Sequence, residues 1–131
     1  MVIGEHEELT QRILKCAYRV SNTLGCGFLE KVYERAMMVA LEREGLPAVS
    51  QMPLKVHFDG VLVGDYVADI IVGHAVLLEI KATEDNPGIY SAQVLNYLKA
   101  THLPVGMLLN FGRPKLYVRR LSLRQNPSQE L

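Results

Sequence analysis

The stretch VADIIVGHAVLLEIKA, residues 67–82, contains two apolar segments separated by a short turn. Valine, isoleucine and leucine dominate both segments, which predicts two β-strands joined as an antiparallel pair. Three charged residues interrupt them, Asp69 in the first segment and Glu79 and Lys81 in the second. A charge taken out of water is costly unless it is paired or binds a ligand. These residues therefore form a solvated edge, a structural ion pair or part of a site.

The length of the turn decides whether the two carboxylates share a face of the sheet. With a three-residue loop, residues 73–75, Asp69 lies opposite Glu79, and opposed residues of an antiparallel pair share a face. With a two-residue loop, Asp69 faces Leu78 and the carboxylates point to opposite sides. A β-bulge would also change the parity. The sequence permits a cluster that includes Lys81 but does not require it.

Periodicity and turn residues predict the other elements. Apolar residues recur at three- and four-residue steps in the helical segments, and the Asp-Gly pair at 59–60 predicts a tight hairpin. The predicted order is helices over 5–24 and 28–44, strands over 51–58, 61–72 and 75–82, a helix over 86–101 capped by Asn86, and strands over 105–110 and 115–120. The core stripe expected for the second helix is Phe28, Leu29, Val32, Ala36, Val39 and Ala40. This order implies a mixed sheet with helices on its faces.

Composition limits the classes of protein that this chain represents. Its 131 residues, 49% of them hydrophobic, suit one globular domain, which we expect over residues 1–122 with a flexible tail over 123–131. The net charge of zero argues against a protein that simply coats nucleic acid. No apolar run is long enough to cross a membrane, and two cysteines are too few for a disulfide scaffold. We therefore expect a cytoplasmic protein with no membrane partner.

Basic residues are concentrated near the C-terminus. Five occur between Phe111 and Gln129, where there are no acidic residues. They form either a solvated edge strand and tail or a patch that faces phosphates. The residues are Arg113, Lys115, Arg119, Arg120 and Arg124.

A cluster of Asp69, Glu79 and Lys81 would have a definite chemistry. Two neighbouring carboxylates repel each other and persist when a cation lies between them or a proton is shared. Hard oxygen ligands favour Mg²⁺ or Mn²⁺, which can polarise a phosphodiester and acidify a bound water. A nearby lysine can stabilise the charge that develops on the phosphate. An aspartate followed ten residues later by Glu-x-Lys also occurs often by chance.

Two helical segments add candidate residues. GFLEKVY, residues 27–33, places Glu30 and Tyr33 one turn apart, although a first-turn glutamate is also favoured by the helix dipole. QVLNY places Gln93 and Tyr97 four residues apart and so on one helical face. Taken alone, that second pair is a polar flank beside an apolar stripe.

The pattern Gly27-x-x-Glu30-x-x-Tyr33 resembles the signature of the GxxExxY proteins, small prokaryotic proteins assigned to the PD-(D/E)XK nuclease superfamily. The resemblance covers nearly the whole chain, from the first helix to LLNFG at residues 108–112. It implies an α/β fold with a restriction-endonuclease-like αβββαβ core. In that fold a mixed β-sheet is flanked by helices, here with an extra N-terminal helix and a C-terminal strand.

The resemblance also implies a role for each matched residue. Asp69, Glu79 and Lys81 would be catalytic, although Ala68 stands in place of the proline that often precedes the aspartate. The metal ion, Mg²⁺ or Mn²⁺, would be held by Glu30, Asp69, Glu79 and the carbonyl group of Ile80. Substrate would be positioned by Gln93, Tyr97 and Tyr33, the first two similar to a Q-x-x-x-Y element of RecB-type exonucleases.

Two functions follow as expectations from this resemblance. The first is a Mg²⁺- or Mn²⁺-dependent nuclease whose expected substrate is DNA, with RNA as the alternative. The alternative is a non-cleaving module on the same fold that binds nucleic acid or protein. Because 131 residues leave little room for sequence-specific recognition, a homodimer or a protein partner would supply it.

Overall fold

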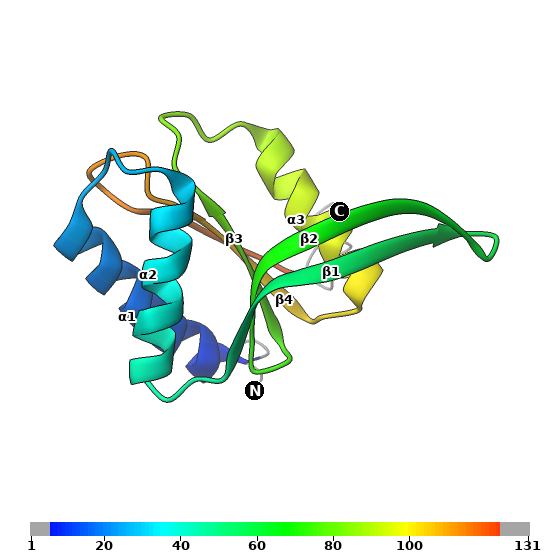
Figure 1. Ribbon diagram of the computed structural model, residues 1–131, viewed down its shortest axis with the longest axis horizontal. Helices are drawn as coiled ribbons and strands as arrows, with labels where there is room; N and C mark the ends of the chain where they lie inside the picture. Colours follow the sequence, from blue (N-terminus) through cyan, green and yellow to red (C-terminus); the bar gives the residue numbers. More distant parts are fainter. Residues whose placement is uncertain (1–5, 124–131) are drawn as a thin grey trace, which may run out of the picture.

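The computed structural model describes residues 6–123 as a five-stranded sheet with helices on both faces (Figure 1). All eight predicted elements are present, and their bounds lie within a few residues of those predicted. In chain order they are α1 (Glu7–Leu24), α2 (Glu30–Arg43), β1 (Ala48–Phe58), β2 (Val61–Val72), β3 (Val76–Lys81), α3 (Gly88–Thr101), β4 (Val105–Asn110) and β5 (Tyr117–Leu121). The elements from α2 to β4 give the predicted αβββαβ order, with α1 and β5 added at its ends.

The sheet is mixed, as the element order predicts. Its strands follow the sequence order β1-β2-β3-β4-β5, and all neighbours are antiparallel except β3 and β4. A parallel pair needs a long crossover connection, and α3 supplies it. β4 lies inside the sheet and is buried along its whole length, which explains its continuous apolar sequence.

Two apolar cores lie on opposite faces of the sheet. α1 and α2 cover one face, and α3 covers the other (Figure 1). Along β3, Leu78 and Ile80 belong to the first core and Leu77 to the second. Because side chains of a strand alternate between faces, Glu79 and Lys81 share the face of Leu77. The charged pair is therefore on the side of α3.

The core stripe predicted for α2 is confirmed at Ala40, which is 7% exposed, and at Ala36, which packs against the core, but the rest of it is wrong. The buried face contains Tyr33, Met37 and Leu41, each 0% exposed. Of the predicted stripe, Leu29 is 79% exposed and precedes the first helical residue, while Val39 is 48% exposed. Apolar residues occur on two adjacent stripes of this helix, so periodicity alone could not choose between them.

The β1–β2 hairpin extends beyond the rest of the sheet as a long arm (Figure 1). Asp59 and Gly60 form its turn with φ angles of 51° and 78°, the two positive angles that a type I′ turn requires. The predicted hairpin is thereby confirmed. Large apolar side chains near the tip stay exposed, including Phe58 at 69% and Val61 at 61%.

Asn110, the last residue of β4, holds the segment that leads from β3 to α3. It is 2% exposed. Its Nδ2 donates hydrogen bonds to the carbonyl oxygen of Asp85 (3.1 Å) and to Oδ1 of Asn86 (2.6 Å), and its Oδ1 accepts one from the amide of Thr83 (3.1 Å). The prediction that Asn86 caps α3 is wrong, because its side chain is engaged here and Pro87 is the N-cap residue.

Two further expectations concern the chain's end and its helices. Apart from Leu123, the predicted tail over 123–131 lies outside the described residues. Within residues 6–123, no helix combines the length and the apolar character needed to cross a lipid bilayer.

Candidate active site

The register of β2 and β3 shows the length of the loop between them. The loop contains three residues, 73–75, and Val72 pairs with Val76. The pairing runs to Ile70 and Leu78, and Asp69 and Glu79 are the next residues along the two strands. Of the alternatives that the sequence left open, the three-residue loop is therefore confirmed.

The strand β2 is irregular at Asp69. Its neighbours Ala68 and Ile70 belong to cores on opposite faces of the sheet, although residues two apart on a regular strand share a face. On the adjacent strand, Gln51 has a φ angle of 56°. Oδ2 of Asp69 accepts a hydrogen bond from the amide of Ile80 at 2.7 Å. This bond holds the carboxylate against β3.

Glu79 is a buried carboxylate that lacks part of its expected bonding. It is 6% exposed, and its Oε1 has no hydrogen-bond partner among the described residues. Its Oε2 lies 3.5 Å from Nζ of Lys81. Burial and the charge of Asp69 together raise the pKa of Glu79 to about 8, although Lys81 opposes the shift. Because a buried oxygen without a partner is costly, this atom marks a place for a proton or a cation.

Acidic residues of α2 add to the negative charge at this point. Burial, with the charges of Glu34 and Glu30, raises the pKa of Asp69 to about 6, although the hydrogen bond from Ile80 opposes the shift. Glu30 is exposed at the start of α2, and its charge also raises the pKa of Glu79. Carboxylates from α2, β2 and β3 therefore contribute to one concentration of negative charge, an acidic cluster.

Glu34 belongs to this concentration, and the sequence did not identify it. It is 7% exposed. Its Oε2 accepts a hydrogen bond from Nε2 of Gln51 at 2.7 Å, and its Oε1 lies 3.5 Å from Nζ of Lys31. Glu34 is four residues from Glu30, so both lie on one helical face. This spacing is the feature of the sequence that could have identified Glu34.

The side chains of α3 surround Lys81 on its other side. Nζ of Lys81 lies 4.5 Å from the centre of the Tyr90 ring, a cation–π contact. Nε2 of Gln93 donates a hydrogen bond to the hydroxyl of Tyr97 at 3.1 Å. Burial raises the pKa of Tyr97, and the charge of Glu79 adds to the shift. Tyr90 was not identified from the sequence, although its three-residue spacing from Gln93 places it on the same helical face.

Tyr33 is fully buried and shapes the loop between α1 and α2. Its hydroxyl donates a hydrogen bond to the carbonyl of Gly25 at 2.7 Å and accepts one from the amide of Phe28 at 3.2 Å. Its ring stacks on Phe111 at a centroid distance of 4.8 Å. These contacts position the loop that leads into Glu30. A direct role in positioning substrate stays a prediction.

The basic residues near the C-terminus do not share one face. Arg113 and Lys115 are exposed in the connection between β4 and β5. Arg119 and Arg120 are adjacent on β5 and pair with residues of opposite cores, so their side chains point to opposite faces of the sheet. A phosphate-binding role for these residues stays a prediction, and Arg124 lies outside the described residues.

The residues present fit a hard divalent cation. Carboxylate oxygens are the ligands that Mg²⁺ and Mn²⁺ prefer, and Mg²⁺ is often held by one or two carboxylates while it keeps several waters. Asp69 and Glu79 supply two carboxylates, and Oε1 of Glu79 lacks a partner. Within residues 6–123, no group of three or more acidic, histidine or cysteine side chains is arranged as a complete metal site. Carbonyl oxygens and water would have to complete the coordination.

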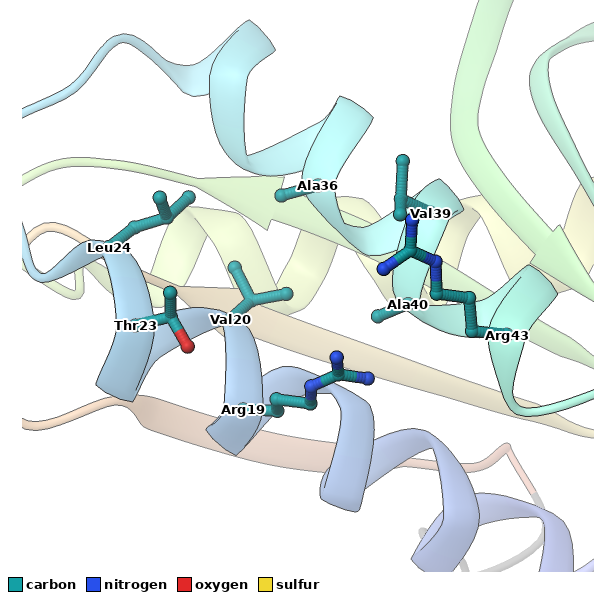
Figure 2. Close-up of a pocket in the computed structure, with 8 residues that line it drawn as sticks. All are labelled: Arg19, Val20, Thr23, Leu24, Ala36, Val39, Ala40 and Arg43. Carbon is teal, nitrogen blue, oxygen red and sulfur yellow. The ribbon is translucent and has the colours of Figure 1, made fainter.

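A separate cavity of about 310 Å³ lies between α1 and α2 (Figure 2). Val20 and Leu24 of α1 face Ala36 and Ala40 of α2 across it. None of the candidate site residues lines this cavity. It is therefore distinct from the cluster of carboxylates.

Comparison with known proteins identifies the family and the fold of the chain. A solved structure described as the crystal structure of SSO0001 superposes with a TM-score of 0.57 at 16% sequence identity, which shows a shared fold. The match covers 89% of this chain, which spans 58% of that one. No curated protein matches the chain. The family model of the PD-(D/E)XK nuclease superfamily matches residues 7–121. The chain belongs to the PD-(D/E)XK nuclease superfamily.

Proposed function

We propose that this chain is a Mg²⁺- or Mn²⁺-dependent nuclease of the GxxExxY group that hydrolyses phosphodiester bonds in DNA, with RNA as the alternative substrate. The observation that carries the proposal is the buried pair of Asp69 and Glu79 beside Lys81. Both carboxylates have raised pKa values, and one oxygen of Glu79 has no partner among the described residues. PD-(D/E)XK nucleases generally use divalent metals, in keeping with such a donor set.

The carboxylates would hold the cation. Asp69 and Glu79 supply the central ligands, the exposed Glu30 reaches the site from α2, and the carbonyl of Ile80 is a further oxygen donor. When bound, a divalent cation supplies Lewis-acid polarisation of the phosphodiester and lowers the pKa of water. The hydrogen bond from the Ile80 amide keeps the Asp69 carboxylate oriented toward β3.

Lys81 would stabilise the negative charge that develops on the phosphate. Its ammonium group lies between the Glu79 carboxylate and the face of the Tyr90 ring. Because this ammonium group is already held in place, little reorganisation is needed when the charge on the phosphate develops. Lys81 would also orient the attacking water by hydrogen bonding.

Other polar residues would position the nucleic acid. The hydrogen-bonded pair of Gln93 and Tyr97 lies beside Lys81 and would contact the substrate. Tyr33 would act through the loop that it holds ahead of Glu30. The basic residues assigned to phosphate contacts along β5 and its preceding connection are Arg113, Lys115, Arg119 and Arg120.

A second candidate function is a binding module that does not cleave. It is favoured by the lack of a complete three-ligand metal site in the part of the chain that the structure describes. In this case the same fold would bind nucleic acid or a protein, and a second copy of the chain or another protein would supply recognition.

Incubation with end-labelled oligonucleotides distinguishes the two functions. We expect the purified chain to cleave DNA in Mg²⁺ or Mn²⁺ and to be inactive in EDTA, and an RNA of the same sequence tests the alternative substrate. Single- and double-stranded forms of one sequence, separated on denaturing gels, give the comparison. Binding without cleavage in every metal tested would contradict the nuclease and support the binding module.

A further inference from the structure

A groove of about 830 Å³ separates the β1–β2 arm from α3. Lys55 and Tyr66 line it from the arm, and Tyr90 and Lys99 line it from the helix. Lys81 is the one residue of β3 among those that line it in residues 6–123. The groove is therefore continuous with the proposed catalytic site. Figure 1 shows the arm running past α3.

The lining of this groove combines positive charge with exposed aromatic and apolar surface. No aspartate or glutamate lines it in the described part of the chain, although Nζ of Lys55 pairs with Asp65 at 2.7 Å. Tyr66 is 49% exposed, and the neighbouring apolar residues Val63 and Ile89 are 60% and 67% exposed. Lysines bind phosphates and aromatic rings stack on bases, the combination that single-stranded nucleic acid requires.

We propose that this groove binds one strand of nucleic acid, with a base stacked on Tyr66 and phosphates bound by Lys55 and Lys99. The strand would run along α3 to Lys81. The choice of nucleic acid as the ligand rests on the proposed nuclease function. The lining of the groove adds that this nucleic acid is single-stranded where it binds.

The walls of the groove favour a single strand over a duplex. The rings of Tyr66 and Tyr97 approach to 5.8 Å between centroids, so the arm and the helix are in contact across part of the groove. A duplex presents phosphates on its outside and keeps its bases stacked inside. Its charged backbone would face the exposed Val63 and Ile89, and Tyr66 would have no base to stack on.

Binding in EDTA tests the groove without depending on cleavage. The probes are a fluorescent single-stranded DNA of about 12 nucleotides and its duplex, measured by anisotropy. We expect the wild-type chain to bind the single strand more tightly. Tyr66→Ala will weaken that binding by roughly 5- to 150-fold, as expected for loss of one stacked base, and Tyr66→Phe will retain it. Lys99→Ala will reduce the slope of log affinity against log salt by about 0.7.

Matched variants control for surface changes elsewhere. Tyr18 on α1 is 45% exposed, close to the exposure of Tyr66, and Tyr18→Ala will bind as wild type. Lys15, whose side chain is 73% exposed, is the matched control for Lys99. Equal binding by Tyr66→Ala and wild type, no binding by wild type, or binding of the duplex at least as tight as of the single strand would overturn the inference.

The outcomes separate this inference from the proposed function. Binding that depends on Tyr66, combined with no cleavage in any metal, would overturn the nuclease and support the groove. Metal-dependent cleavage combined with binding that does not depend on Tyr66 would support the nuclease and overturn the groove.

Discussion

Replacing Lys81 by alanine will reduce metal-dependent cleavage by about 10²- to 10³-fold, the usual effect of removing one group that stabilises charge in the transition state. Lys81 carries the ammonium group that contacts both Glu79 and Tyr90. Without it, the ammonium group beside the Glu79 carboxylate is lost. The measurement is the initial rate of oligonucleotide cleavage in Mn²⁺ at a saturating substrate concentration.

A second variant separates the charge of Lys81 from its packing. Lys81→Met keeps an unbranched apolar stem over the Tyr90 ring and removes only the ammonium group, so it will be as inactive as Lys81→Ala and will keep the wild-type Tm. Lys15→Ala removes an exposed lysine and will keep the wild-type rate. Cleavage by Lys81→Met at the wild-type rate would show that the charge is not used, or that the activity comes from a contaminant.

Glu79→Gln will be more stable than wild type in metal-free buffer at pH 8.5, by on the order of 3 kcal/mol. Burial and repulsion from Asp69 raise the pKa of Glu79 to about 8, and one pKa unit corresponds to about 1.4 kcal/mol. Local rearrangement when Glu79 ionises offsets part of the free-energy cost that the whole pKa difference would give. Glutamine has the shape of the protonated glutamate and never ionises, so the variant avoids this penalty.

The direction of the pH dependence follows from the raised pKa values. A carboxylate with a raised pKa binds its proton more tightly in the folded than in the unfolded chain. For Asp69 and Glu79 the stabilisation is complete below about pH 4, and it is lost as pH rises through about 6 and about 8. The stability of wild type will therefore fall over this range, and Glu79→Gln will lose less.

Urea unfolding at pH 4.5, 6.5 and 8.5, monitored by circular dichroism, gives the comparison. The two proteins will be of similar stability at the lowest pH and will diverge as pH rises. Glu42→Gln, a change at an exposed carboxylate of α2, will differ from wild type by less than about 0.5 kcal/mol throughout. A Glu79→Gln variant less stable than wild type at the highest pH would show that the ion pair with Lys81 stabilises the ionised carboxylate.

Local chemistry explains why so much of the fold could be predicted. The Asp59-Gly60 turn and the apolar strands around it are specified by neighbours in the chain, and the bounds of β2 and β4 match those expected. The loop at 73–75 was one of two alternatives, because the choice depends on how the two strands pair. The predicted residues Asp69, Glu79 and Lys81 are brought together once this pairing is known.

Long-range packing explains what could not be predicted. The buried face of α2 depends on which of two apolar stripes meets the sheet, and that choice buries Glu34 near the site. The bond from the Ile80 amide to Asp69 arises from an irregularity in β2. Asn110 lies at the end of an otherwise apolar strand, and its role depends on bonds to residues 24 to 27 positions away.

A Mn²⁺ titration at pH 8.5 by isothermal calorimetry shows whether Asp69 and Glu79 form a site for a divalent cation. We expect wild type to bind Mn²⁺, because the cation neutralises two buried carboxylates and satisfies Oε1 of Glu79. Asp69→Asn and Glu79→Gln will lose this binding, whereas Lys81→Met will retain it. Mn²⁺ binding of equal affinity in wild type and Glu79→Gln, or no binding by wild type at millimolar concentrations, would contradict the claim.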